Sequence, residues 1–361
     1  MDIFNEKNLE FLYKYLNNAA PTGSEKSGQK IWAEYIRPWV DEIHLDIYGT
    51  CYGVINPGAE HRVVIESHAD EISWFVNHIC DKGYIRVIRN GGSDHAIAPA
   101  KRVLIHTKNG PVKGVFGWPA IHTRRGTNAK LNATLDNIFI DLGAKDKKEV
   151  EEMGVHVGSI VTFEDEITEL NKNFFAGRGL DNKMGGFVIA QVARLLKEKN
   201  IELPYSLYLV NSVQEEVGLK GAHMVAETIK PHVAIVTDVT HDTSTPLVDA
   251  KKHGDVQSGN GPTVTYAPAV HYKLVEMATA IAEEMEIPYQ REASSRTTGT
   301  DTDAFAYSNG GVPSILLSLP LRYMHTTVEM AHKDDIENLV KWILESVKKL
   351  NPGDDFRYFV P

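Results

Sequence analysis

The chain alternates helix-like and strand-like segments near both ends but not in its middle, and this interruption most constrains its fold. Apolar residues recur at helical spacing over residues 6–18, and helix-like and strand-like segments take turns again after residue 181. Between residues 73 and 163, short β-rich runs alternate with Gly and Pro turns, and helical periodicity is nearly absent. The first pattern predicts a sheet covered by helices on both faces, and the second predicts a small barrel or sandwich. We therefore expect a three-layer α/β domain, formed by residues 1–72 and 164–361, with a β-rich domain at 73–163 inserted into it.

Periodicity also predicts the individual elements. We expect helices at residues 6–18, 31–36, 147–153, 182–199, 221–230, 272–286, 301–309 and 333–350. We expect strands at residues 43–47, 52–55, 63–65, 84–88, 102–106, 112–116, 137–141, 159–163, 205–213, 233–237 and 314–319.

The charge balance and hydropathy exclude two classes of partner. The chain has 38 Lys and Arg against 48 Asp and Glu, so its formal net charge is −10. Binding to a nucleic-acid backbone needs a basic surface, so we expect no nucleic-acid partner. No apolar run approaches the roughly 20 residues that span a bilayer, so we expect no membrane partner.

The number of cysteines and the first residues of the chain indicate the cellular compartment. Two cysteines, Cys51 and Cys80, exclude a disulfide framework and a cysteine-rich zinc module, and they suit a reducing compartment. The first residues show neither the basic nor the apolar region of a secretory signal. We therefore expect a cytoplasmic protein.

Five residues that could bind a metal ion lie near the ends of expected strands or before a helix. They are His68, Asp181, Glu216, Asp238 and His325. Ligands of open α/β sheets bind beyond the carboxyl ends of the strands, so we expect these residues to converge. Imidazole and carboxylate groups without a thiolate suit zinc, cobalt or manganese, and one open site needs about three protein ligands. Five side chains therefore suffice for two ions if Asp181 bridges them.

Each of these residues also has an ordinary structural explanation. The alternatives are a helix cap for Asp181, a loop contact to Thr240 for Asp238, a solvated acidic pair for Glu215 and Glu216, a core position for His325, and a surface or capping pair for His68 with Asp70. No single residue decides between the two interpretations. Their joint order along the chain favours the metal centre.

The motifs that carry these residues are similar to those of a known family. They are Ser67-His68-Ala69-Asp70-Glu71-Ile72, Gly177-Arg178-Gly179-Leu180-Asp181-Asn182-Lys183-Met184-Gly185, Gln214-Glu215-Glu216-Val217-Gly218-Leu219-Lys220-Gly221-Ala222, Asp238-Val239-Thr240-His241 and Arg322-Tyr323-Met324-His325-Thr326-Thr327-Val328-Glu329. Over nearly its whole length the chain resembles the M42 family of metallo-aminopeptidases, the glutamyl and tetrahedral aminopeptidase group, some members of which are labelled endoglucanase. The block Gln-Glu-Glu-Val-Gly and the order of the motifs make this resemblance specific.

The resemblance implies a role for each motif residue. His68, Asp181 and Asp238 would hold one divalent metal ion, and Asp181, Glu216 and His325 would hold the other, with zinc first and cobalt or manganese as alternatives. Glu215 would be the general base that takes a proton from a metal-bridging water, and Asp70 would orient His68.

The family also implies a use for the insertion and a substrate class. Its β-rich insertion is a PDZ-like barrel used in dimerisation, and many members assemble into dodecameric tetrahedra. The implied activity is removal of N-terminal residues from short peptides. For this chain a homo-oligomer is expected, dimer-based, with the dodecamer as its largest form.

Several alternatives stay open at this point. The same metal centre could serve a carboxypeptidase or an amide deacylase, and Glu215 with another carboxylate could imitate the acid and base of a glycoside hydrolase. A catalytically idle binding protein is a further alternative. For Asp301 and Asp303, in the motif Gly-Thr-Asp-Thr-Asp, we expect helix capping. His241 is left outside the expected ligand set.

Overall fold

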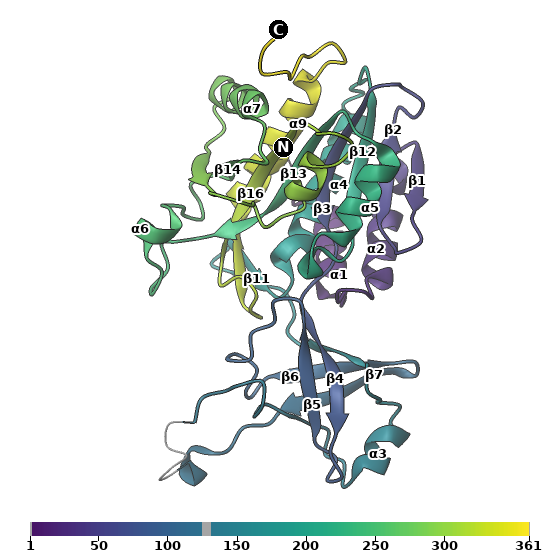
Figure 1. Cartoon of the computed structure of the whole chain (residues 1–361), viewed down its shortest axis with the longest axis vertical. Coiled ribbons are helices and arrows are strands. Elements are labelled where there is room, and N and C mark those ends of the chain that lie inside the picture. Colours follow the sequence, from purple (N-terminus) through teal and green to yellow (C-terminus); the bar gives the residue numbers. More distant parts are fainter. Residues whose placement is uncertain (1, 125–130, 361) are drawn as a thin grey trace.

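The computed structural model describes residues 2–124 and 131–360, which form two bodies (Figure 1). The larger body is an α/β unit, and the smaller is a barrel made by the middle of the chain. Residues 125–130, inside the predicted insertion, lie outside the described residues, as do the terminal residues 1 and 361.

An eleven-stranded mixed sheet forms the centre of the larger body. Its strands are β1 (Glu42–Leu45), β2 (Cys51–Ile55), β3 (Arg62–His68), β10 (Thr168–Leu170), β11 (Phe174–Gly177), β12 (Ser206–Ser212), β13 (Val233–His241), β14 (Thr263–Tyr266), β15 (Gln290–Ala293), β16 (Ser314–Arg322) and β17 (Glu329–His332). The main order is β1-β2-β12-β3-β13-β16-β17-β11-β10, and β14 pairs with β15 and β16. The central strands β12, β3, β13 and β16 run parallel, so their carboxyl ends lie at one edge of the sheet.

Helices cover the central strands, which are buried at nearly every position. One group is centred on α4 (Leu180–Glu198), which packs on β3, β12 and β13 and contacts α1 (Glu6–Asn17), α2 (Lys26–Ile36) and α9 (Lys333–Lys349). A second group contains α5 (Lys220–Ile229) and α8 (Thr302–Ala306), which contact each other; α5 packs on β12, and α8 packs on β13 and β16. The remaining helices of this body are α7 (Tyr272–Glu284), which packs on α9 and β14, and the short α6 (Ala250–His253).

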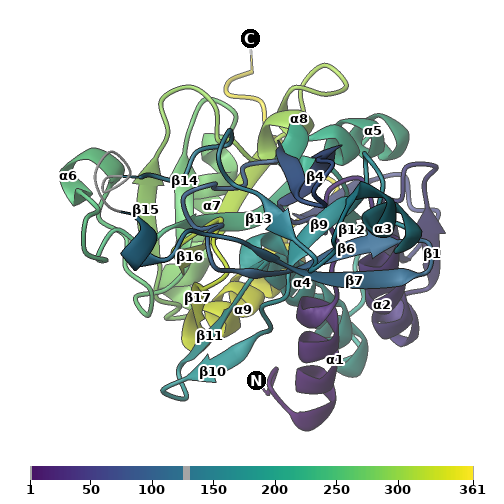
Figure 2. The ribbon, with the colours of Figure 1, turned by 90° about the horizontal axis from the view of Figure 1, so that it is seen from below.

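The smaller body is a closed barrel with the strand order β4-β5-β8-β7-β6-β9. Its strands are β4 (Ser73–Ile79), β5 (Ile85–Asn90), β6 (Arg102–Thr107), β7 (Gly110–Phe116), β8 (Ile140–Asp141) and β9 (Ile160–Phe163), and α3 (Lys147–Glu152) precedes β9. The barrel has an apolar core of its own around Trp74, Ile105 and Phe116, separate from the core of the larger body. In the view from below, the barrel strands lie in front of the sheet (Figure 2).

The predicted fold class is confirmed, because an α/β body carries an inserted closed barrel. The sequence pattern missed β4, β10, β11, β14, β15 and β17, and of the strand expected at 137–141 the assigned part is Ile140–Asp141. The division at residues 72/73 and 163/164 into separate domains stays a prediction. Among the helices of the described residues, none combines the length and the apolar character that a membrane span requires.

Candidate metal centre

The five predicted ligands lie together at the carboxyl edge of the parallel strands. They come from the end of β3 (His68), the start of α4 (Asp181), the turn after β12 (Glu216), β13 itself (Asp238) and the loop after β16 (His325). Segments separated by up to 257 positions in sequence therefore meet at one site, since parallel strands bring their carboxyl ends to the same edge.

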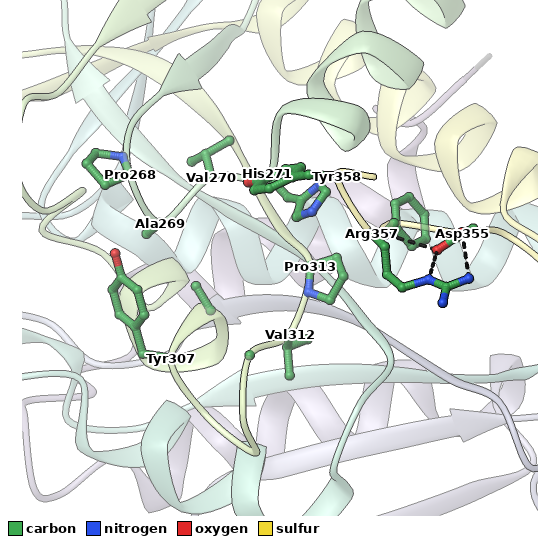
Figure 3. A pocket seen from close by; sticks show the side chains of 13 residues that line it. Pro268, Ala269, Val270, His271, Tyr307, Val312, Pro313, Asp355, Arg357 and Tyr358 are labelled. Carbon is green, nitrogen blue, oxygen red and sulfur yellow. Dashed lines mark hydrogen bonds and ion pairs between the residues drawn. The ribbon is translucent and has the colours of Figure 1, made fainter. Parts of the chain in front are cut away.

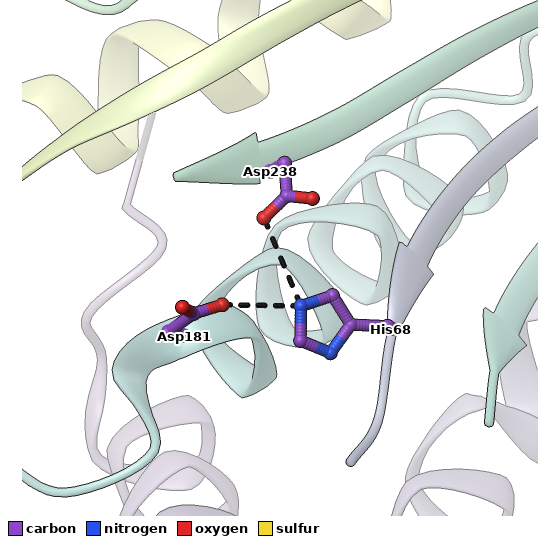
Figure 4. Close-up of side chains that lie close together, drawn as sticks. All are labelled: His68, Asp181 and Asp238. Atoms are coloured by element: carbon purple, nitrogen blue, oxygen red, sulfur yellow. Dashed lines mark hydrogen bonds and ion pairs between the residues drawn. The ribbon is translucent and has the colours of Figure 1, made fainter. Parts of the chain in front are cut away.

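The first ligand group consists of His68, Asp181 and Asp238, whose potential ligand atoms lie within 4.8 Å of one another. Figure 4 shows the two carboxylates facing one ring nitrogen of the imidazole. Nε2 of His68 is 3.1 Å from Oδ1 of Asp181 and 3.7 Å from Oδ1 of Asp238. All three side chains are buried.

The second ligand group consists of Asp181, Glu216 and His325. Nε2 of His325 is 3.1 Å from Oδ2 of Asp181 and 3.3 Å from Oε1 of Glu216. The two carboxylate oxygens of Asp181 thus face different imidazoles, Oδ1 toward His68 and Oδ2 toward His325. This is the arrangement that a bridging carboxylate requires.

Local backbone geometry overturns the simplest alternatives for these residues. The regular part of α4 begins after Asn182, whose side-chain oxygen accepts the amide of Gly185 at 3.1 Å, while the Asp181 carboxylate faces the two imidazoles. Asn182 and not Asp181 therefore caps the helix. The carboxylate of Asp238 accepts a hydrogen bond from the amide of Val239, where a contact to Thr240 had been the alternative. His325 has φ +62° and a side chain 32% exposed, so it is not a buried core histidine.

Asp70 lies behind the ligand groups and contacts both His68 and the turn after β12. Nδ1 of His68 is 3.4 Å from Oδ1 of Asp70 and 3.1 Å from its carbonyl oxygen. The Asp70 carboxylate also accepts hydrogen bonds from the amides of Glu215 at 3.0 Å and Glu216 at 3.2 Å. One buried carboxylate thus contacts a ligand imidazole and the turn that presents the two glutamates.

The electrostatics of the two groups favour a cation. Burial raises the pKa of Asp238 well above its ordinary value, and it also raises the pKa of Glu216. Burial alone would lower the pKa of each imidazole, but the neighbouring carboxylates raise the pKa of His325 to about 11 and that of His68 well above its usual range. The acidic groups of this buried site outnumber the two imidazoles, so even two protonated imidazoles leave an excess of negative charge. Divalent ions bound by this oxygen and nitrogen donor set would compensate that excess.

Glu215 lies beside both groups but belongs to neither. Its carboxylate is 10% exposed, and its Oε2 is 3.9 Å from Nε2 of His68. Burial raises the pKa of Glu215 to about 10, and the charge of Asp238 adds to this effect. Its carboxyl group therefore lies close to the ligands without belonging to either ligand group.

Sequence reasoning missed a buried ion cluster below the start of α4. The Glu71 carboxylate accepts hydrogen bonds from the Arg178 guanidinium and from Nζ of Lys183, the latter at 3.2 Å, and all three side chains are buried. Burial would raise the pKa of Glu71, but the two cations lower it to about 2. Burial lowers the pKa of Lys183 to about 8, which the attraction of Glu71 offsets only in part. Arg178 and Lys183, the basic residues on either side of Asp181 in the glycine-rich motif, were the available sequence signal.

The barrel also contributes to the site, which the sequence did not predict. A Cβ atom built on Gly92, in the segment after β5, would lie 2.5 Å from Nδ1 of His325. A Cβ atom on Gly91 would lie 3.1 Å from Cβ of Glu216. The absence of side chains at these two glycines therefore allows the backbone to pack against two ligands of the second group.

Three further residues have different roles from those expected or left open. Asp301 is at the N-cap position of α8, but its side chain accepts a hydrogen bond from Ser212 at 2.6 Å and does not cap the helix. Asp303 accepts hydrogen bonds from the amides of Thr298 and Gly299 in the preceding loop. Helix capping by either side chain was therefore wrong. His241 lines the cavity in front of the metal-ligand groups and belongs to neither group.

Two cavities differ in their chemistry. The cavity in front of the two ligand groups has a volume of about 850 Å³ and is lined by all five predicted ligands and Glu215. A separate pocket of about 390 Å³ lies under the C-terminal tail (Figure 3). There Asp355 is already paired with Arg357, at 2.9 and 3.0 Å. Among the described residues, both ligand groups belong to the first cavity.

Comparison with known proteins identifies the family of the chain. The profile of the M42 glutamyl aminopeptidase family matches residues 49–342. A lysyl aminopeptidase of Pyrococcus furiosus is 32% identical over 354 residues, which cover 96% of this chain and 98% of the relative. The crystal structure of a TET aminopeptidase from a marine sediment Thaumarchaeota archaeon has a TM-score of 0.91 and 28% identity, covering 96% of this chain and 98% of that one. The Pyrococcus horikoshii TET1 peptidase, which can assemble into a tetrahedron or a large octahedral shell, has a TM-score of 0.83 and 28% identity, covering 95% and 99%. Since the matched region contains every predicted ligand, the chain belongs to the M42 glutamyl aminopeptidase family of peptide hydrolases.

Proposed function

We propose that this protein is a dinuclear metal-dependent aminopeptidase that removes N-terminal residues from short peptides. Membership of the M42 family supports the peptidase activity. The observation that carries the dinuclear assignment is the position of Asp181, whose two carboxylate oxygens each lie 3.1 Å from a different imidazole. A single structural zinc site would not need one carboxylate whose two oxygens face two different imidazoles.

We propose that His68, Asp181 and Asp238 hold one ion and that Asp181, Glu216 and His325 hold the other. Zinc suits these donors best, and cobalt or manganese would also fit imidazole and carboxylate ligands. When bound, two divalent ions polarise the scissile carbonyl and lower the pKa of the attacking water.

Glu215 is the proposed general base. Its carboxylate would accept a proton from the attacking water as the new C–O bond forms, and would then donate that proton to the nitrogen of the departing amine as the C–N bond breaks. Asp70 would support this step, since it accepts the amide hydrogen bonds of both Glu215 and Glu216 and thereby fixes the turn that presents them.

The proposed assembly is a dimer-based homo-oligomer associated through the barrel at residues 73–163. The TET1 relative can assemble into a tetrahedron or a large octahedral shell. In this chain, apolar side chains are exposed on the barrel, including Ile121 and Val157 at 70% and 62%. We expect light scattering after gel filtration to give a multiple of the 40.2 kDa chain mass, that of a dimer, of a dodecamer or of another dimer-based assembly. A 40.2 kDa species at micromolar concentration would contradict this proposal.

A cytoplasmic location is likewise a proposal.

The function is tested with a panel of aminoacyl-p-nitroanilides, offered with free and with N-acetylated amino groups. We expect metal-loaded protein with about two ions per chain to cleave only the free-amine substrates, because an aminopeptidase needs the free amino group. Removal of the ions with a strong chelator should abolish cleavage, and adding zinc or cobalt should restore it.

Other outcomes of the same panel would favour other functions. Cleavage of acetylated substrates would point to an amide deacylase, and release of C-terminal residues from blocked peptides would point to a carboxypeptidase. Cellulose hydrolysis that survives the chelator would favour a glycoside hydrolase. Each of these results would contradict the proposed aminopeptidase.

A further inference from the structure

A buried glutamate outside both ligand groups connects two segments that carry metal ligands. Glu329, the first residue of β17, is 2% exposed. Its Oε2 accepts hydrogen bonds from the amides of Leu180 at 2.8 Å and Asp181 at 3.3 Å. Its Oε1 accepts a hydrogen bond from the amide of His325 at 2.8 Å. One carboxylate therefore joins the start of α4 to the loop after β16.

The position of Glu329 follows from the sheet. Glu329 pairs with Gly177 at the end of β11, so its side chain reaches the segment that leads into α4. Figure 2 shows β17 beside β11. The first amides of a helix have no partner within the helix, and a carboxylate satisfies them well. Within the described residues, the hydrogen-bond partners of the Glu329 carboxylate are all backbone amides.

The two connected segments have backbone conformations that need support. His325 has φ +62° and Tyr323 has φ +58°, in the left-handed region that residues other than glycine rarely adopt. Asp181 is outside the helical region although α4 begins around it. Hydrogen bonds to Glu329 hold the amides of both His325 and Asp181, and Gly92 of the barrel packs against the imidazole of His325.

We propose that Glu329 is a positioning residue for the second ligand group, setting the separation of Asp181 and His325 and thereby the affinity of that group for its ion. This inference rests on the proposed dinuclear centre. The first group depends less on Glu329, because Asp181 is its only member that Glu329 holds by a hydrogen bond. Its other members, His68 and Asp238, are placed by β3 and β13. The expected effect is therefore unequal between the two ions.

The test is Glu329→Gln, with metal content as the first readout. The side-chain amide of Gln would place an N–H group opposite backbone N–H groups that now donate hydrogen bonds to Glu329, so those bonds would be lost. Outer-shell substitutions typically weaken metal binding by about 10–100-fold, and we expect a loss of this size for one of the two ions. Zinc content per chain after dialysis at fixed free zinc should fall from about two toward about one. Excess zinc should restore both the second ion and kcat.

Asp335→Asn is the matched control. Asp335 is a fully buried carboxylate on α9 that accepts hydrogen bonds from the amides of Gly259 at 2.6 Å and Gly261 at 2.8 Å. It belongs to neither ligand group. We expect this variant to lose stability while keeping two ions. Circular dichroism should show that both variants fold, and Glu329→Asp should bind the second ion with intermediate affinity.

The outcomes separate the inference from the proposed function. If wild-type protein binds two ions and Glu329→Gln binds both with unchanged affinity, the positioning role is wrong and the dinuclear centre stands. If Glu329→Gln loses both ions equally and excess zinc restores neither, the effect is a general loss of structure and the inference is overturned. If wild-type protein itself binds fewer than two ions, the proposed function fails first.

Discussion

Replacing Glu215 with Gln is expected to lower kcat by about 10²–10⁴-fold, the usual contribution of a general acid–base residue. Gln has nearly the same size and keeps one oxygen, but it cannot accept the proton of the attacking water. Since Glu215 lies outside both ligand groups, the variant should retain its bound ions. KM for an aminoacyl-p-nitroanilide should change much less than kcat, because the lost interaction is made with the transferring proton in the transition state and not with the bound substrate. Steady-state kinetics together with metal analysis would measure both quantities.

The control for this variant is Glu227→Gln. Glu227 is an exposed glutamate on α5, the helix that follows the Glu215 turn, and it does not line the cavity in front of the ligand groups. Its substitution should leave kcat and metal content unchanged. A Glu215→Gln variant with wild-type kcat would exclude the proposed base, and one that loses an ion would show that Glu215 is a ligand.

The core of the fold was predictable because its strands are buried on both faces. Strand β3, with Val63, Val64 and Ile65, is a short apolar run, and β16 is another. Two of the missed strands, β10 and β15, are different. All three residues of β10 are exposed, and β15 alternates between exposed and half-buried positions, so neither carries an apolar signal. They are strands because β11 and β14 pair with them, and such pairing is not visible in a local pattern.

The ligands of the candidate site were predictable for a related reason. His68 directly ends a recognisable strand, and Asp238 lies within another, so the rule about carboxyl ends applied to them. The supporting residues were not predictable in this way. Glu71 meets Arg178 across 107 positions, and Glu329 meets Asp181 across 148. Neither of these long-range contacts produces a periodic pattern in the sequence, so each becomes visible only in the folded structure.

Substituting Glu71 with Gln is expected to destabilise the fold by about 3–5 kcal/mol, the usual cost of breaking a buried ion pair from one side. The variant would leave the Arg178 guanidinium and the Lys183 ammonium buried without their carboxylate. Denaturant unfolding at fixed protein and metal concentration would measure the loss. The control is Glu152→Gln, which removes an exposed pair with Lys148 at 3.6 Å and should cost no more than about 1 kcal/mol.

The same cluster predicts a dependence of stability on pH. The pKa of Glu71 in the folded chain is about 2, below its ordinary value of 4.5, because Arg178 and Lys183 favour the charged form despite burial. A carboxylate whose pKa is lowered by folding contributes stability that is full above the unfolded pKa and is lost as the pH falls through the folded one. The difference in unfolding free energy between wild type and Glu71→Gln should therefore shrink as the pH falls from about 4.5 to about 2. A difference that stays constant across that window would show that Glu71 acts through packing and not through its charge.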